Sequence, residues 1–122
     1  MDIMDAITTA SELVPSARRE GDAVVAAVRG EIDLSNSAEL RTELLDLIQK
    51  AKPARLVLNL AQVPYMDSSA VAVLVESLQK MRKTGGKVIL TTLQPRVRSL
   101  LEIAHLNSIF VLVRDEQEAM AT

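Results

Sequence analysis

Residues 55–60 read RLVLNL, residues 61–66 read AQVPYM, and residues 67–83 read DSSAVAVLVESLQKMRK. The first run is short, aliphatic and almost wholly apolar, which predicts a buried strand. Pro64 indicates a loop in the second run. In the third run apolar residues recur at helical spacing, at Val71, Leu74, Val75 and Leu78. This stripe predicts a helix over residues 68–83, and a strand, loop and helix in this order are typical of an α/β fold.

The same alternation extends along the rest of the chain. Further strands are expected at residues 12–19, 23–29, 87–92 and 109–113, and further helices at residues 33–50, 95–105 and 115–120. Ser35 or Asn36 is expected to cap the first helix, and Pro15 marks the first strand as an edge strand. The sequence therefore predicts one α/β domain over residues 11–122: a small mixed sheet of four or five strands, with three central strands parallel, packed with three or four helices.

The first ten residues, 1–10, show no clear period and are expected to be loosely ordered. They carry Asp2 and Asp5 rather than the basic start of a secretory signal. No apolar run approaches the ~18 residues of a membrane-spanning helix. These features favour a cytoplasmic protein that does not insert directly into a membrane.

Composition excludes several classes of function. The 122 residues carry a net charge of -2, and their aromatic residues are only Tyr65 and Phe110, so neither a basic footprint nor a stacking platform for nucleic acid is present. The absence of cysteine removes disulfides, thiolate metal sites and cysteine nucleophiles. We therefore expect no nucleic-acid partner, no metal and no cofactor.

Catalytic constellations are missing as well. The only histidine, His105, has no second histidine or acidic pair beside it, so a partly exposed helix residue is the favoured interpretation. Ser68 lacks the Gly-x-Ser-x-Gly context of a hydrolase nucleophile. Gly85 and Gly86 follow a helix and precede a strand, which is the reverse of a phosphate-binding loop. The sequence therefore predicts a protein that is not an enzyme.

The most informative residue is Ser68, at the start of the helix that follows the buried strand. Asp67 and Ser68 are common helix caps, so they could do no more than begin the helix. A phosphate on the Ser68 hydroxyl would, however, face the positive end of the helix dipole and free backbone N–H groups, and the fold could carry it. The carboxyl edge of parallel strands is also where partners usually bind.

Several stretches together resemble the STAS domain (sulfate transporter and anti-sigma factor antagonist), above all its stand-alone bacterial anti-sigma factor antagonists. The stretches are Gly30-Glu31-Ile32-Asp33, the helix from Ser37, Leu56-Val57-Leu58-Asn59-Leu60 and Tyr65-Met66-Asp67-Ser68-Ser69. The resemblance runs from about Leu13 to Ala121, and Asp-Ser-Ser between strand and helix is its most specific part. One departure is Ala70, where the family commonly has glycine.

The resemblance implies a partner switch. In that family the unphosphorylated antagonist binds an anti-sigma factor that is also a serine kinase, and the sigma factor is released. The kinase phosphorylates the switch serine, the antagonist dissociates, and a 2C-class metal-dependent phosphatase resets it. Ser68 matches the switch serine. The expected partner-binding residues are Asp33, Ser35, Asn36, Asp67, Ser68 and Ser69.

An alternative stays open within the same fold, namely the small STAS subunit of a lipid-transport ATP-binding cassette complex. Such a subunit supports assembly of the complex and needs no phosphorylation. The intact Asp67-Ser68-Ser69 element favours the antagonist. The sequence does not specify an oligomeric state.

Overall fold

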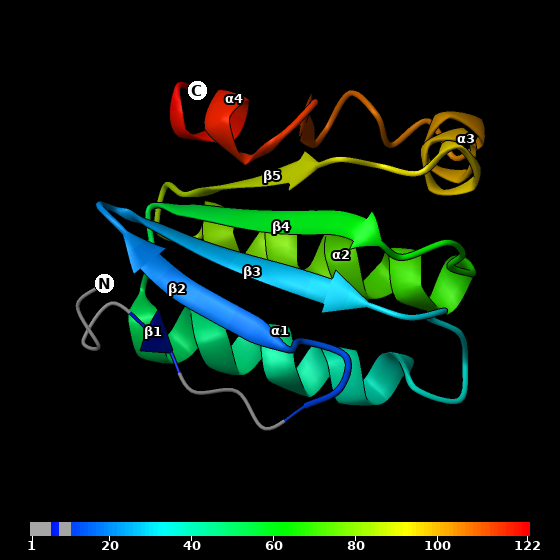
Figure 1. Cartoon of the computed structure of the whole chain (residues 1–122), viewed down its shortest axis with the longest axis horizontal. Coiled ribbons are helices and arrows are strands. Elements are labelled where there is room, and N and C mark those ends of the chain that lie inside the picture. The colour runs from blue at the N-terminus through cyan, green and yellow to red at the C-terminus, as the bar shows by residue number, and fades with distance from the viewer. Residues whose placement is uncertain (1–5, 8–10) are drawn as a thin grey trace.

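The computed structural model describes residues 6–7 and 11–122 and contains a single six-stranded sheet with four helices (Figure 1). The strands are β1 (Ala6–Ile7), β2 (Ser16–Glu20), β3 (Ala23–Arg29), β4 (Arg55–Gln62), β5 (Lys87–Thr91) and β6 (Val111–Val113). The helices are α1 (Ser37–Ala51), α2 (Ser68–Arg82), α3 (Pro95–Ile103) and α4 (Glu116–Met120). The single α/β domain predicted from the sequence is confirmed.

The strands follow one another across the sheet in chain order, from β1 to β6. β1, β2 and β3 pair antiparallel, whereas β3, β4, β5 and β6 pair parallel. The sheet is therefore mixed, with the predicted parallel centre. Five strands have three or more residues, and the two-residue β1 is added at one edge.

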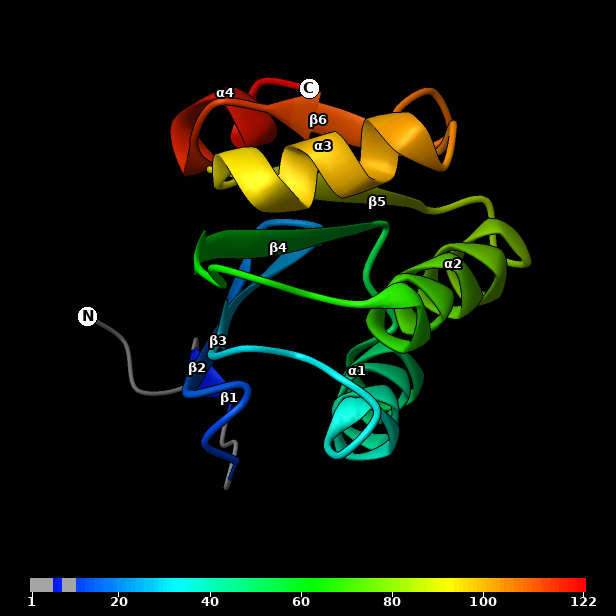
Figure 2. The same cartoon turned by 90° about the vertical axis from the view of Figure 1, so that its right-hand side faces the viewer.

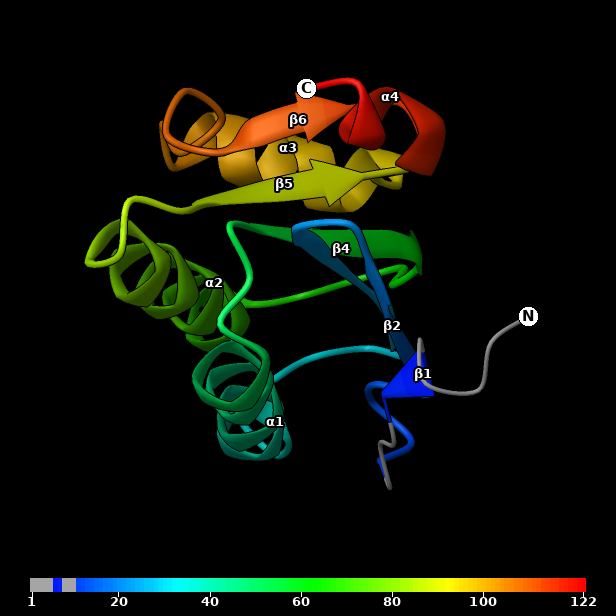
Figure 3. The same ribbon diagram turned by 90° about the vertical axis from the view of Figure 1, so that its left-hand side faces the viewer.

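Each face of the sheet buries a separate apolar cluster. Leu56, Leu58 and Leu60 of β4 point to the large core, where they meet apolar residues of α1, α2 and α3. Val57, between them, points to the other face and joins a small cluster that Ala119 of α4 covers. This alternation is the period of two expected for a strand that is buried on both faces. Figure 3 shows α1 and α2 on one side of the sheet and α4 on the other.

The parallel strands bring three loops to one edge of the molecule, because the carboxyl ends of parallel strands lie at the same edge. These loops connect β3 to α1, β4 to α2, and β5 to α3. Figure 2 views the molecule from this side, with α2 between α1 and α3. The start of α2, which carries Ser68, therefore lies among all three loops.

Some predicted boundaries were wrong, for local reasons. β2 begins after Pro15 rather than at residue 12, and it is not an edge strand, since β1 pairs with it. Helix α1 begins at Ser37 rather than at residue 33, because the residues before it form a hydrogen-bonded turn. Helix α3 ends at Ile103, since His105 adopts a left-handed backbone with φ of 58°.

The expectation of loose order for residues 1–10 concerns mainly residues outside the described ones. Within that segment only Ala6–Ile7 is described, as strand β1. Its pairing partners in β2 are Arg18 and Ala17.

Candidate functional site

Asp67 organises the edge of the sheet at which Ser68 lies. Its Oδ1 accepts hydrogen bonds from the backbone N–H groups of Ser69 at 2.9 Å and Ala70 at 3.2 Å, so Asp67 is the N-cap of α2. Its Oδ2 accepts a third backbone hydrogen bond, 3.1 Å long, from Leu34 in the loop before α1. One carboxylate therefore caps a helix and ties a neighbouring loop to it.

The loop before α1 is a compact turn. The Asn36 side chain accepts a hydrogen bond from the Asp33 N–H at 2.9 Å and donates one to the Glu31 carbonyl at 2.9 Å. Asp33 in turn accepts from the N–H and the hydroxyl of Ser35. Asn36 is the N-cap residue of α1, as expected, but its side chain makes no capping hydrogen bond, because the Ser35 and Asn36 side chains both bond backward into this turn. The Asp33 carbonyl also accepts from the N–H of Ser37, the first residue of α1, so the turn leads directly into the helix.

Backbone pairing joins this turn to the loop before α2. Ile32 and Met66 form a parallel bridge, with the Ile32 N–H donating to the Tyr65 carbonyl at 3.0 Å and the Asp67 N–H donating to the Ile32 carbonyl at 3.1 Å. Ile32 is fully buried beneath them. The structure therefore brings the predicted residues of both loops, 33–36 and 67–69, onto one continuous surface.

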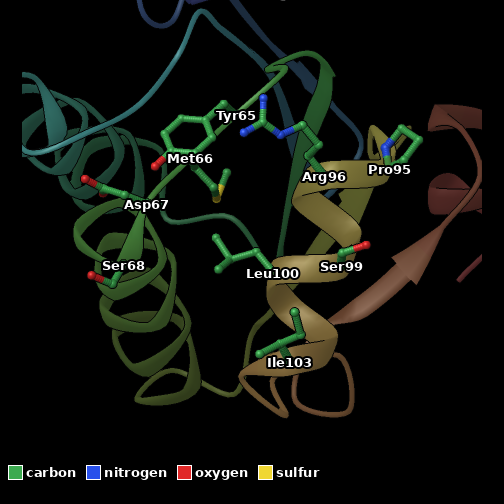
Figure 4. A pocket seen from close by; sticks show the side chains of 9 residues that line it. All are labelled: Tyr65, Met66, Asp67, Ser68, Pro95, Arg96, Ser99, Leu100 and Ile103. Atoms are coloured by element: carbon green, nitrogen blue, oxygen red, sulfur yellow. The ribbon is translucent and has the colours of Figure 1, made fainter.

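The two adjacent serines differ in their surroundings. The Ser69 hydroxyl donates to Asp67 Oδ1 over 2.5 Å, and its side chain is half-buried. Ser68 is exposed, and within the described residues its hydroxyl has no hydrogen-bond partner. Figure 4 shows the Ser68 hydroxyl pointing away from α3. Of the two, Ser68 has the hydroxyl that a second protein can reach.

The electrostatics around Ser68 differ from the expectation based on the sequence in one respect. The free N–H groups expected to face a phosphate on Ser68 are not all free, because Asp67 already occupies those of Ser69 and Ala70. The hydrogen bond from the Ser69 hydroxyl, aided by backbone N–H groups of Ala70, Ser69 and Leu34, lowers the pKa of Asp67 below its ordinary value. Asp67 is therefore a fixed negative charge beside Ser68.

Ala70, which stands where the resemblance led us to expect glycine, does not obstruct this surface. Ala70 is fully buried and belongs to the large core, on the inner face of the first turn of α2. An added methyl group that faces the core changes the packing of the helix and leaves the surface around Ser68 open.

A groove of about 520 Å³ separates the start of α2 from α3. Asp67 and Ser68 lie on its α2 side, and Leu100 and Ile103 project from α3 toward α2 (Figure 4). At one end the guanidinium of Arg96 lies 5.0 Å from the centre of the Tyr65 ring, a cation–π distance.

Comparison with known proteins identifies the fold. The model of the STAS domain family matches residues 14–119. The chain belongs to the STAS domain family. The anti-sigma-B factor antagonist of Bacillus subtilis is 33% identical to this STAS domain over 82 residues, which are 67% of this chain and 73% of that protein. The anti-sigma-B factor antagonist of Listeria monocytogenes is 30% identical over 100 residues, or 82% and 87% of the two chains.

Solved structures have the same architecture. The anti-sigma factor antagonist SpoIIAA in its unphosphorylated form matches the STAS domain with a TM-score of 0.66 and 20% identity, over 86% of this chain and 93% of that one. Bacillus SpoIIAA in its phosphorylated form matches equally, with a TM-score of 0.66 and 19% identity over 86% and 96%. At this level of identity the likeness concerns the fold.

Sequence reasoning missed the α3 side of the site. Arg96 and Ile103 line the groove, as does Tyr65, whereas the sequence predicted α3 only as a helix over residues 95–105 with no part in the site. Ile103 lies outside the apolar stripe of Val97, Leu100 and Leu101, which is the signal that the sequence carries, and in the structure it is 76% exposed. In residues 6–7 and 11–122 there is no cluster of three or more potential metal ligands of the histidine, cysteine or carboxylate type. No helix in this part of the STAS domain is long and apolar enough to cross a bilayer.

Proposed function

We propose that this STAS domain is an anti-sigma factor antagonist controlled by phosphorylation of Ser68. Unphosphorylated, it binds an anti-sigma factor that is also a serine kinase. Phosphorylated, it is released, until a 2C-class metal-dependent phosphatase removes the phosphate. The observation that carries this proposal is the contrast between the two serines: the Ser68 hydroxyl is exposed and has no hydrogen-bond partner in residues 6–7 and 11–122, whereas the Ser69 hydroxyl is held by Asp67.

Phosphorylation transfers the γ-phosphoryl group of ATP to Ser68 Oγ. The new O–P bond replaces the serine O–H bond, the proton leaves to solvent, and ADP departs. The product carries about -1.5 to -2 charges beside the carboxylate of Asp67. Because Ser68 is exposed, its phosphate remains hydrated, and none of the hydrogen bonds described at this edge is broken.

Binding should respond differently from folding. A partner shaped for a hydroxyl would have to strip water from a doubly charged group next to a second anion, which is unfavourable. A loss of ~3 kcal/mol weakens binding more than a hundredfold. The two SpoIIAA structures support only the folding half of this expectation, since an antagonist of the same fold has been solved both unphosphorylated and phosphorylated.

The test uses the purified serine-kinase anti-sigma factors of the source genome, each incubated with ATP and the wild-type chain, Ser68→Ala, Ser68→Asp or Ser69→Ala. Phosphate incorporation and affinity are both measured. We expect Ser68→Ala to bind and to resist phosphorylation, Ser68→Asp to bind poorly, and Ser69→Ala to remain a substrate. Charge reversal by Asp33→Lys should weaken binding by more than Ser35→Ala does, since both variants loosen the turn but only Asp33→Lys also reverses its charge.

Two results would contradict the proposal in different ways. If Ser68→Ala is phosphorylated and Ser69→Ala is not, the modified serine is Ser69, and the assignment to Ser68 is wrong. If no kinase binds the wild-type chain and neither serine is modified, the switch is wrong, and a subunit of a lipid-transport ATP-binding cassette complex becomes the better hypothesis.

A further inference from the structure

Two large aliphatic side chains lie in solvent, and both are at the edge that carries Ser68. Leu34 is 81% exposed and Ile103 is 76% exposed, and in the part of the chain that the structure describes no other large hydrophobic residue is exposed. Leu34 adjoins Asp67 through the hydrogen bond from its N–H. Ile103 lines the groove together with Ser68. The pair therefore stands on either side of Ser68, one on the α1 side and one on the α3 side.

The exposure of Leu34 is built into the backbone. The turn around it is closed by the hydrogen bonds of Asp33 and Asn36, and its own N–H is held by Asp67. This bonding fixes the residue at the surface. Its side chain can lose contact with water only against another molecule, and the hydrophobic effect makes such contact favourable.

The groove beside Ile103 combines apolar and cationic features. Leu100 and the ring of Tyr65 supply apolar surface, and the guanidinium of Arg96 lies over that ring. Arg96 has no ion-pair partner among the described residues. The α1 side carries the opposite charge, from Asp33 and the exposed Glu31. The surface is therefore apolar at two points, positive at Arg96 near α3, and negative at Asp67 beside Ser68 and at the turn before α1.

We propose that Leu34 and Ile103 are the apolar anchors of this chain on its serine-kinase anti-sigma factor, and that a carboxylate of that partner pairs with Arg96. The inference deepens the function proposed above and rests on it. Charge complementarity fixes the orientation: the kinase surface carries aliphatic side chains opposite the two anchors, an acidic residue toward α3, and basic residues toward the α1 turn.

This arrangement gives the switch a physical basis. Ser68 lies between two contacts that must expel water to form. A phosphate on Ser68 holds its hydration shell, and this water prevents the partner from approaching Leu34 and Ile103 closely enough to make either apolar contact. In most interfaces a few well-packed residues that lose all contact with water carry most of the binding energy.

The experiment measures calorimetric binding of each purified serine-kinase anti-sigma factor of the source genome, with ADP present so that no phosphate is transferred. The variants are Leu34→Ser, Ile103→Ser and Arg96→Glu, and Ser68→Asp is measured beside them as the test of the switch. Arg98→Glu, an equal charge change at an exposed residue of α3 outside the groove, is the charge control, and Ala104→Ser is the control beside Ile103. The thermal midpoint of every variant is recorded, and because all the altered residues are exposed it should stay near the wild-type value.

We expect each of the three groove and turn variants to raise Kd at least about tenfold, which is ~1.4 kcal/mol, while both controls stay within about twofold of wild type. If the wild-type chain binds and Ser68→Asp does not, yet Leu34→Ser and Ile103→Ser bind as wild type, the anchors are wrong and the switch stands. If the wild-type chain binds no kinase, both the switch and the anchors are wrong. Equal losses for Arg96→Glu and Arg98→Glu would exclude a specific carboxylate opposite Arg96.

Discussion

Leu74 offers a quantitative test of how α2 is held on the sheet. It lies in the middle of the helix that carries Ser68, on the face turned to the large core, and is 1% exposed. Leu74→Ala removes three buried carbon atoms from a closely packed site. Such substitutions cost about 2–5 kcal/mol. Domains of ordinary stability unfold with about 5–15 kcal/mol, so the variant should fold but unfold at clearly lower urea concentration.

Leu74→Asp should cost more, since it buries a charge without a partner. Burial would raise the folded-state pKa of the introduced carboxyl above its unfolded value. The penalty is then largest when the carboxyl is charged and shrinks as the pH falls toward the raised pKa. The stability gap between Leu74→Asp and the wild-type chain should therefore narrow on mild acidification, and the gap for Leu74→Ala should not.

Urea unfolding followed by circular dichroism measures both variants. Gln79→Ala is the matched control, because it also shortens a side chain of α2 but at an exposed position, where changes stay within about 0.5 kcal/mol. A cost for Leu74→Ala equal to that of Gln79→Ala would refute the assignment of this face to the core. Affinity for the partner, measured on the folded fraction, should be unchanged, because Leu74 is not at the surface.

Two further predictions concern carboxylates. Asp67→Asn should destabilise the chain at neutral pH. Hydrogen bonding lowers the folded-state pKa of Asp67, so its contribution to the free energy of unfolding is present above the unfolded pKa and is lost as the pH falls through the lowered folded-state pKa. The urea midpoints of Asp67→Asn and the wild-type chain should therefore converge as the pH falls below roughly 4. A difference between the two midpoints that widens in this range would contradict the prediction. Glu116→Gln should loosen α4 by about 1 kcal/mol, since Glu116 accepts from Arg18 at 2.9 Å and from Asn59 at 2.7 Å. Hydrogen exchange of the α4 amides should accelerate more in Glu116→Gln than in Glu118→Gln. Equal acceleration in the two variants would show that the hydrogen bonds of Glu116 do not hold α4 in particular.

The fold was largely predictable because its signals are local. β3 spans Ala23–Arg29 as predicted, a compact apolar run between two turns. The stripe of α2 is buried at Val71, Leu74 and Leu78, as a period of 3.6 requires, although Val75 is only half-buried. The predicted boundaries were wrong where a polar side chain can form hydrogen bonds either in a helix cap or in a turn. Asn36 could cap a helix or close a turn, and only the positions of Asp33 and Glu31 in three dimensions decide between them.

The site was only half predictable for a related reason. Asp33 and Asp67 could be placed together, since parallel strands deliver their loops to one edge. The contact of Tyr65 with Arg96 joins the loop before α2 to the first turn of α3, and no spacing in the sequence indicates it. The exposure of Leu34 is a similar case, because an aliphatic residue between polar neighbours indicates a turn but does not show which way its side chain faces.

The hydrogen bonds at this edge explain why a charge switch suits position 68 and not position 69. The hydrogen bonds that hold the start of α2 and the loop before α1 together are made by Asp67 and by the turn before α1. None of those described uses the Ser68 hydroxyl. A phosphate on Ser68 therefore changes the surface charge while every one of these bonds remains. A phosphate on Ser69 would replace a hydrogen bond to Asp67 with repulsion between two anions at the N-cap itself. Repulsion between the two anions would weaken the N-cap of α2, so under the proposed switch a phosphate leaves the cap undisturbed on Ser68 and not on Ser69.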